Sequence, residues 1–495
     1  MFRPLYLAVV LAGLSGPVLA QSDLMTIYQE ALLNSADLAA AEADALARQE
    51  VLPQARSLLL PNIGLGAGLA REYIDVDGAG SDDYSTHYYQ ASLTQPLFRA
   101  DRWFNYQAAK AQSEQAQVEF SAIQQQLILD VAQAYFNVLR ASDNLATARA
   151  EEAAFERQLE QARERFEVGL AARTDVLEAL AGFDAARATR ITAATNLDVS
   201  YQALTRLTNR DHPELLGMSH ELPILAPTPV DMQQWVDTAA AQNLSLQAFR
   251  LAIDSASEAL RSSKSGYAPA VDAFVRYSDN HGGARMAGNT GRGDTELTQI
   301  GVEMTLPLFT GGGTSSRIRE STFRLSQAEQ ASEAELRRVV ERTRNLFRTV
   351  TSSVEEVDAR RQTIISSKAA LDATQTGYEV GTRNVVDVLD AQRNLYRAVR
   401  DYNDARYNYI IDNLSLKQAA GTLSPQDLED LSAWLKPDYD PDRDFIPPFT
   451  EEEMRRMNIG NGQSQRQPRR LQRNELIERT ERIEQPLQDG VRTTF

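Results

Sequence analysis

Four segments of the chain alternate between apolar and polar or small residues. In the first, Ile63, Leu65, Ala67 and Leu69 are separated by glycines, and three later segments follow the same pattern. A period of two with one apolar face is typical of β-strands. The alternation therefore predicts four strands, over residues 62–74, 84–98, 270–279 and 297–309.

Other parts of the chain follow the period of an α-helix. Between Pro96 and Pro213 there is no proline, and the only glycines are Gly169 and Gly182. Apolar residues there recur every three or four positions, which predicts one face of a helix. At about 1.5 Å per residue, the two longest predicted helices would measure roughly 100 Å and roughly 95 Å, lengths typical of a coiled-coil tube or rod. The predicted helical stretches are 24–60, 101–167, 172–208, 230–266, 317–379 and 384–420.

The chain repeats itself at an offset of about 210 residues. The segment FEVGLAARTDVLEAL at 166–180 matches YEVGTRNVVDVLDAQ at 378–392, and QPLF at 95–98 matches LPLF at 306–309. A fixed offset indicates two copies of one structural unit. We expect a first repeat at 22–228, a second at 229–423, a short helix at 424–436 that begins with a Ser-Pro capping pattern, and a tail at 437–495.

The N-terminus has the pattern of a secretory signal peptide. Arg3 precedes an apolar run at 5–14, and small residues precede Gln21. We expect residues 1–20 to be this peptide, the alternative being a buried N-terminal helix. No second run of 18 apolar residues follows, and the mean hydropathy is −0.39. A role in the membrane would therefore depend on the β-strands or on peripheral attachment.

Charge and chemistry exclude several classes of function. A net charge of −17 disfavours nucleic acid as a partner. Four scattered histidines and no cysteine give no metal-ligand cluster. Motifs of hydrolases and nucleotide-binding enzymes are missing too, so we expect no enzyme, no cofactor and no metal.

The strands allow two interpretations. One is a half-buried sheet in water, and the other is a barrel wall with one face in lipid. Tyrosines such as Tyr73, Tyr84, Tyr88 and Tyr277 lie toward the strand ends, where an interfacial aromatic belt would lie. Lipid does not tolerate open sheet edges, and four strands cannot close a barrel. The membrane interpretation therefore requires several chains, and three would supply twelve strands.

Residues 378–428 resemble the closing helix pair of TolC-type outer-membrane efflux proteins, and FEVGLAARTDVL resembles the other hairpin tip of that family. The resemblance covers residues 22–436. It implies an α+β membrane protein, a homotrimer with a twelve-stranded β-barrel in outer-membrane lipid and a long α-helical coiled-coil barrel in the periplasm. Residues 209–232 and the segment after Gly421 would form a mixed equatorial domain. The lipidated cysteine of many relatives is missing, and the tail 437–495 resembles nothing specific, so we expect it to be mostly disordered.

The resemblance also implies a function. Such proteins are the exit duct of tripartite efflux pumps or of type I secretion systems. They work with a periplasmic adaptor protein and an inner-membrane transporter of the RND, ABC or MFS type. The alternative from another class is a structural coiled-coil scaffold of the cell envelope, which would explain the helices but not the signal peptide with four strands.

Asp387 and Asp390 are the candidate gate. They lie three residues apart on one helix, so both project from one face. By the resemblance they would form two acidic rings at the periplasmic entrance, whereas their residue types alone also fit a solvated helix face. The resemblance assigns links that hold the tip closed to Thr174, Asp175, Tyr378 and Arg383.

The two glycine turns are the candidate docking tips. Glycine allows the positive φ that a tight reversal between helices requires. By the resemblance, the tips would bind the periplasmic adaptor. The residues concerned are Val168, Gly169, Leu170, Val380, Gly381 and Thr382.

Overall fold

The computed structural model describes residues 22–77, 80–282, 294–450 and Glu453. The chain divides into two compact units, Met1–Pro448 and Phe449–Phe495, and the fold below is that of the first unit. The predicted signal peptide at 1–20 and most of the predicted tail lie outside the described residues.

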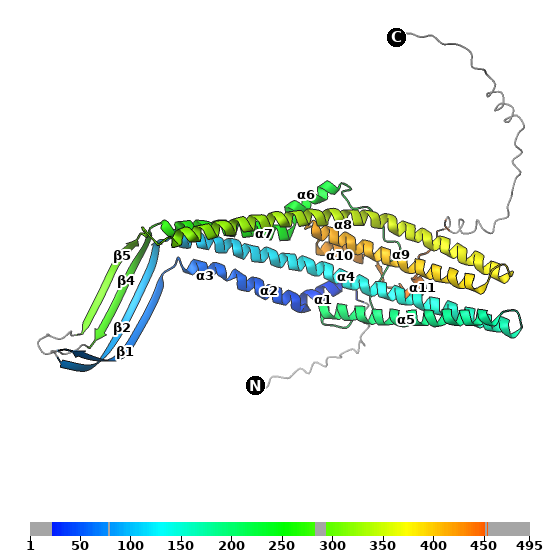
Figure 1. The fold of residues 1–495 in the computed structure, drawn as a ribbon, viewed down its shortest axis with the longest axis horizontal. Coiled ribbons are helices and arrows are strands. Elements are labelled where there is room, and N and C mark those ends of the chain that lie inside the picture. The colour runs from blue at the N-terminus through cyan, green and yellow to red at the C-terminus, as the bar shows by residue number, and fades with distance from the viewer. Residues whose placement is uncertain (1–21, 78–79, 283–293, 451–452, 454–495) are drawn as a thin grey trace, which may run out of the picture. The chain divides into compact units, whose positions relative to one another are not determined.

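Two helical hairpins dominate this unit. The helix α4 (Ala100–Glu167) turns at Gly169 into α5 (Arg173–Thr208), and α8 (Gly313–Glu379) turns at Gly381 into α9 (Val385–Ala419). Within each hairpin the two helices pack along one another, and α4 also packs against α9. The four-stranded sheet lies at one end of α4 and α8, and the two turns lie at the other (Figure 1).

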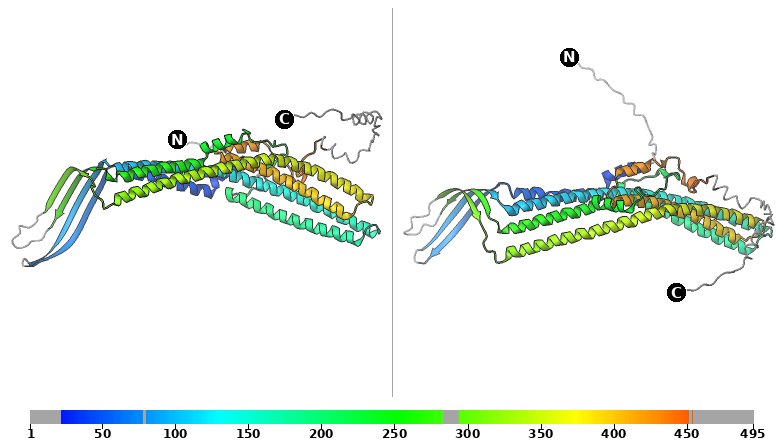
Figure 2. Two further views of the ribbon diagram at one scale, coloured as in Figure 1. Left: turned by 45° about the horizontal axis from the view of Figure 1, so that its top comes forward. Right: turned by 90° about the horizontal axis from the view of Figure 1, so that it is seen from above.

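The two remaining helical stretches are each broken, where the sequence predicted one continuous helix. Residues 24–60 form α1 (Leu24–Asn34), α2 (Ala36–Gln49) and α3 (Val51–Ser57), and residues 230–266 form α6 (Met232–Gln242), α7 (Leu244–Lys264) and a single 3₁₀ turn. Ser35 and Asn243 have extended backbones, and their side-chain oxygens accept hydrogen bonds from the N–H groups of Leu38 and Leu246. Such capping begins a new helix in the middle of a helical pattern. The shorter helices run beside α4 and α8 (Figure 2).

The sheet contains four antiparallel strands in the order β1-β2-β4-β5. Strand β5 ends at Thr305 rather than at the predicted 309, since Pro307 lacks the N–H that a ladder hydrogen bond requires. Apolar side chains project freely from the sheet: Leu65 is 84 % exposed and Ile300 is 78 % exposed. The strands are β1 (Asn62–Val76), β2 (Gly80–Phe98), β4 (Ala270–His281) and β5 (Thr295–Thr305).

The core follows α4. The face predicted from Leu127, Val131, Tyr135 and Val138 is buried, with no more than 5 % of any of these residues exposed. The Tyr135 hydroxyl donates to the Leu216 carbonyl oxygen over 2.7 Å, so its one polar atom is satisfied inside the core.

A small mixed domain lies beside the middle of the long helices. It contains β3 (Gly217–Met218), which pairs with β6 (Leu435–Lys436), and the helix α10 (Pro425–Ser432). The expected cap of α10 is present: Pro425 is in its first turn, and the Asp427 carboxylate accepts from the Ser424 N–H over 2.8 Å. Within the tail that we expect to be mostly disordered, residues 437–448 are ordered and contain the short helix α11 (Pro441–Asp444), which packs against α4.

No helix of the described residues is long and apolar enough to cross a membrane.

Candidate functional site: the hairpin tips

The two hairpins end in matching glycine turns. Gly169 has φ +77° and Gly381 has φ +80°, and a Cβ built on either would touch nothing within 4 Å. Glycine is therefore needed at the turns for backbone conformation and not for space. The turns close by hydrogen bonds from the Leu170 N–H to the Arg165 carbonyl oxygen (2.7 Å) and from the Thr382 N–H to the Gly377 carbonyl oxygen (2.8 Å).

Apolar side chains project from both turns into solvent. Val168 is 69 % exposed, Leu170 is 71 % exposed and Val380 is 69 % exposed. Clustered apolar residues at an exposed tip are typical of a contact surface. Val168 and Leu170 lie on the two sides of Gly169, whereas in the second turn Val380 precedes Gly381 and the polar Thr382 follows it. All the residues predicted as docking tips lie on these two turns.

The matching aspartates of the two repeats, Asp175 and Asp387, lie in the first turn of a helix. The Asp387 carboxylate accepts from the Asn384 N–H over 3.3 Å, and the Asn384 side chain accepts in return from the Asp387 N–H over 2.8 Å. In the first hairpin the Asp175 carboxylate accepts from the Ala172 N–H over 3.2 Å. Each carboxylate thus satisfies a free N–H at a helix start, where the helix dipole also favours negative charge.

Three predicted residues line one groove between α8 and α9. Arg383, Asp387 and Asp390 lie along it, with Ser366 and Ser367 of α8 opposite. The Arg383 guanidinium is 3.9 Å from the Asp387 carboxylate, and Asp390 is bound by Arg393 over 2.6 Å. All three side chains are exposed to a third or more, so water screens these charges strongly.

The other predicted links are not joined within one chain. Thr174 donates to its neighbour Asp175 over 3.5 Å. Among the described residues, neither forms a hydrogen bond or ion pair with Tyr378 or Arg383 of the same chain. Tyr378 is instead buried, 8 % exposed, beneath the guanidinium of Arg165, which lies 4.7 Å from the ring centroid.

The Arg165 contact belongs to a seam between the two hairpins that the sequence did not predict. Along the seam, side chains of α4 meet arginines of α9 or the tyrosine of α8. The contacts are Arg165 with Tyr378, Phe155 with Arg393 (5.8 Å to the ring centroid) and Glu151 with Arg400 (2.6 Å). Glu151 and Phe155 lie four residues apart, and Arg393 and Arg400 seven apart. These spacings place each pair on one face of its helix, and this was the only signal in the sequence that could have indicated the seam.

The described residues contain no group of three His, Cys, Asp or Glu side chains arranged to hold a metal ion.

Comparison with known proteins identifies the class. The model of the family described as outer membrane efflux protein matches residues 27–210 and 235–422, one match in each repeat. The chain belongs to this family. It is 39 % identical over 433 residues to the outer membrane protein TolC of Vibrio cholerae, covering 88 % of this chain and 98 % of that one.

Two further comparisons agree. The chain is 35 % identical over 459 residues to the outer membrane protein TolC of Escherichia coli, covering 91 % of this chain and 92 % of the relative. Its fold matches the crystal structure of the CmeC outer membrane channel of Campylobacter jejuni with a TM-score of 0.72, at 17 % identity, over 85 % of this chain and 92 % of that one.

These matches confirm the resemblance to TolC-type proteins and the two-repeat architecture. The protein is an outer-membrane channel of the efflux and type I secretion class, located in the outer membrane with a periplasmic extension. Its matched relatives are channel proteins and not known enzymes.

Proposed function

We propose that three copies of this chain form one continuous duct, which passively conducts substrates from a periplasmic adaptor and inner-membrane transporter to the outside. The observation that supports this proposal is that the sheet has open edges and exposed apolar side chains. Strands β1 and β5 are open edges, and the sheet projects residues such as Leu69, 88 % exposed, into the surroundings. Lipid tolerates exposed apolar side chains but not unpaired edges, so other copies must close the sheet into a barrel of twelve strands.

The same geometry supports a gate at the tips. In a trimer, Asp387 and Asp390 would bring six carboxylates to the entrance, which favours passage of cations. The links that keep this entrance closed would join Arg383 and Tyr378 to Thr174 and Asp175 of a neighbouring copy, since among the described residues of one chain no hydrogen bond or ion pair joins them. Exposed pairs of this kind each contribute about 0–1 kcal/mol, which suits contacts that must open.

The gate is tested by reversing the charge of Arg383. We expect Arg383→Glu to place a carboxylate beside Asp387 and to raise the mean single-channel conductance of purified trimers in planar lipid bilayers several-fold. Arg337→Glu is the matched control, because Arg337 is also an exposed arginine, 78 % exposed, paired with a glutamate within its own helix α8. Equal conductance of Arg383→Glu and wild type would rule out Arg383 as a link.

We also propose that the two glycine turns bind the periplasmic adaptor through their exposed apolar residues. The turns have the same conformation in both repeats, so one adaptor surface would fit either. A charge at Leu170 should weaken that contact without disturbing the fold, because the side chain touches little of its own chain. We expect Leu170→Asp trimers to lose most adaptor in a pull-down from envelope extracts, and full retention would contradict the docking role.

A further inference from the structure

The segment after β6 crosses three long helices. Residues 437–448, here called the C-terminal strap, contact side chains of α4, α8 and α9. The contacts are Arg149 of α4 with Asp442 (3.0 Å), Asn403 of α9 with the Phe445 carbonyl oxygen (3.2 Å) and Arg361 of α8 with the Pro448 carbonyl oxygen (2.9 Å). The strap therefore bridges the α4–α5 hairpin and the α8–α9 hairpin.

The strap is anchored in a buried ionic cluster. The Tyr439 hydroxyl donates to Asp143 Oδ1 over 2.8 Å, and the Tyr407 hydroxyl donates to Asp143 Oδ2 over 2.8 Å. Arg406 lies 3.9 Å from the same carboxylate, and the side chains of Asp143 and Arg406 are each 1 % exposed. Since Asp143 is on α4 and Arg406 on α9, the cluster joins the two hairpins directly.

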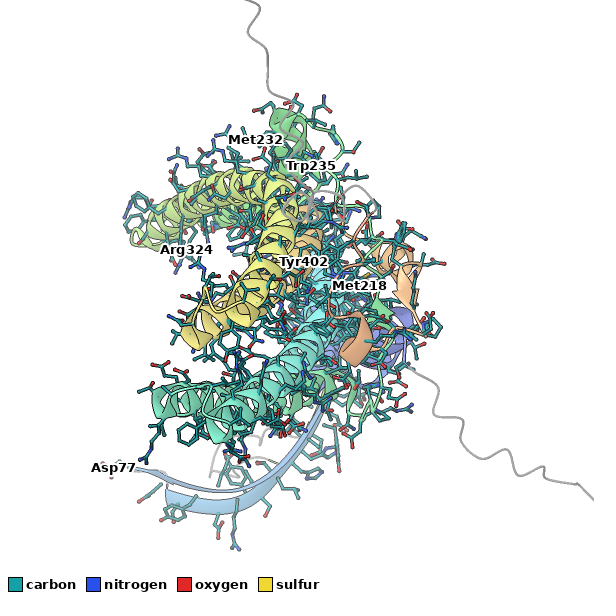
Figure 3. All side chains as sticks on the ribbon, turned by 90° about the vertical axis from the view of Figure 1, so that its right-hand side faces the viewer. Asp77, Met218, Met232, Trp235, Arg324 and Tyr402 are labelled. Carbon is teal, nitrogen blue, oxygen red and sulfur yellow. The ribbon has the colours of Figure 1, made fainter. Side chains whose placement is uncertain are left out.

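His220 extends the cluster to the strap backbone. One ring nitrogen contacts the Arg406 guanidinium, and the other, Nε2, bonds to the carbonyl oxygen of Asp444 over 2.7 Å. Arg406 also donates to the Met218 carbonyl oxygen over 3.2 Å. Met218 and Tyr402, whose ring lies 6.1 Å from that of His220, lie near the centre of the view from the tip end (Figure 3).

Tyr439 closes the cluster to water. Its ring fills the space beside Gly217, where an added Cβ would overlap the ring atoms. Removing one hydrogen-bond partner from a buried ion pair is strongly destabilising, because it leaves a buried charge less compensated. In this cluster the Nε of Arg406 already lacks a partner among the described residues. Removing the strap would take one of the two hydroxyl donors from Asp143 and expose the pair, so the cohesion between α4 and α9 depends on the strap.

The position of these contacts connects them to the gate. Arg149 precedes the end of α4 by 18 residues, about 27 Å along the helix. In the proposed gate, the tips would open by a movement of the α8–α9 hairpin against α4, the helix that it packs against. We propose that the C-terminal strap is a tether that limits this movement, and that Tyr439 is the positioning residue through which it holds the gate closed. This inference rests on the proposed channel function.

A reversible test uses the complete lack of cysteine in the chain. A Cβ built on Gly217 lies 2.7 Å from the Tyr439 Cβ, within about 1 Å of the 3.5–4.5 Å spacing that a disulfide bond needs. The double variant G217C/Y439C would fasten the strap when oxidised and release it when reduced. We expect full-length trimers of this variant in planar bilayers to conduct little more than wild type when oxidised, because only the hydroxyl contact with Asp143 is lost, and several-fold more after reduction.

Tyr439→Phe provides an independent variant. It keeps the ring beside Gly217 and removes only the hydroxyl donor, and we expect a smaller rise in conductance. Tyr28→Phe is its matched control, a tyrosine of α1 that is also buried, 6 % exposed, but lies away from the strap. A merely structural role of Tyr439 would lower thermal stability and leave conductance unchanged.

The outcomes separate the two proposals. If wild-type trimers form no channels in the bilayer, the proposed function is wrong and the tether fails with it. The second outcome requires that wild type conducts and that the reducing agent leaves its conductance unaltered. If oxidised and reduced G217C/Y439C then conduct equally, the channel function is retained and the tether is overturned.

Discussion

The helices α4 and α8 occupy the same place in the two repeats and have almost the same length, 68 and 67 residues. Their surroundings differ greatly. Of the residues of α4, 25 are buried, whereas α8 buries 10. Helix α4 packs against α5, α7, α9 and the N-terminal helices, while α8 packs mainly against α7 and α9. A repeated sequence pattern therefore does not give the two copies equal roles.

The difference in burial indicates that α4 contributes more than α8 to the stability of a single chain. Its buried face includes Tyr135 and Phe136, both fully buried, and the Asp143 carboxylate that holds the C-terminal strap. Helix α8 instead keeps residues such as Phe323, 73 % exposed, on a free flank. A second copy of the chain would pack against that flank, so α8 would gain its remaining contacts when the chains assemble.

The largest expected effect is the loss of a buried ring from α4. Phe136→Ala would leave a cavity in the core, and we expect it to lower the free energy of unfolding by about 3–5 kcal/mol. Phe323→Ala removes the same side chain from the exposed flank of α8, and we expect less than about 1 kcal/mol. Denaturant unfolding of the two variants in detergent, followed by circular dichroism, compares them directly.

Equal destabilisation by the two alanine substitutions would contradict the inferred difference in packing between α4 and α8. It would mean that α8 is packed as tightly as α4 in the assembled protein and that the asymmetry belongs to the single chain. A loss confined to Phe136→Ala would place the folding core on α4 in the assembly too.

A smaller effect concerns acid sensitivity, which we expect at His220, because its ring contacts Arg406, the partner of Asp143 on α4. Burial, followed by the charge of Arg406, lowers the pKa of His220 to about 3, with Arg361 acting in the same direction and Asp444 against it. The unfolded chain, with an ordinary histidine pKa of about 6.5, binds more protons below that pH, so stability falls as the pH falls. Between pH 6.5 and pH 5 the loss should be about 1.5 kcal/mol.

The measurement is the free energy of unfolding at these two pH values for wild type and His220→Gln. Burial raises the pKa of Asp143, against the opposing effects of Arg406 and the two tyrosine hydroxyls, so Asp143 favours the folded state as the pH falls. Both proteins carry Asp143, and its contribution cancels in the difference between them. If His220→Gln kept the full pH dependence of wild type, the acid sensitivity would lie elsewhere than the strap.

Periodicity was sufficient to predict the long elements. The period of two in the strands and the period of 3.6 in α4 and α8 are local signals, and the offset of the repeats placed equivalent elements in register. The breaks at Ser35 and Asn243 were missed, because a cap needs only one polar side chain and leaves the helical pattern on either side intact. Gly182 is one of the two glycines between Pro96 and Pro213, but the sequence does not show why glycine is needed there. The requirement comes from tertiary packing, because an added Cβ would lie 2.7 Å from the Phe155 ring.

In the candidate site, too, the sequence predicted features with a local pattern and missed contacts between distant residues. The glycine turns were predicted because a reversal between helices has a local requirement for positive φ. The buried cluster was not, since Asp143 and Tyr439 are 296 residues apart and no local pattern marks them as partners. The roles of Asp387 and Asp390 in a gate stay predictions, with the added finding that Asp387 completes the capping box of α9 with Asn384.

The two free edges of the sheet have a genetic consequence. In the proposed barrel the two edges, β1 and β5, differ, so copies would join head to tail, and a ring would form only when every junction is made. A chain damaged at β5 alone would still pair through β1 and enter a ring that it could not complete. In a cell that produces damaged and intact chains equally, about one eighth of three-membered rings would contain only intact chains. Such a mutation would therefore be dominant over the normal allele rather than recessive to it.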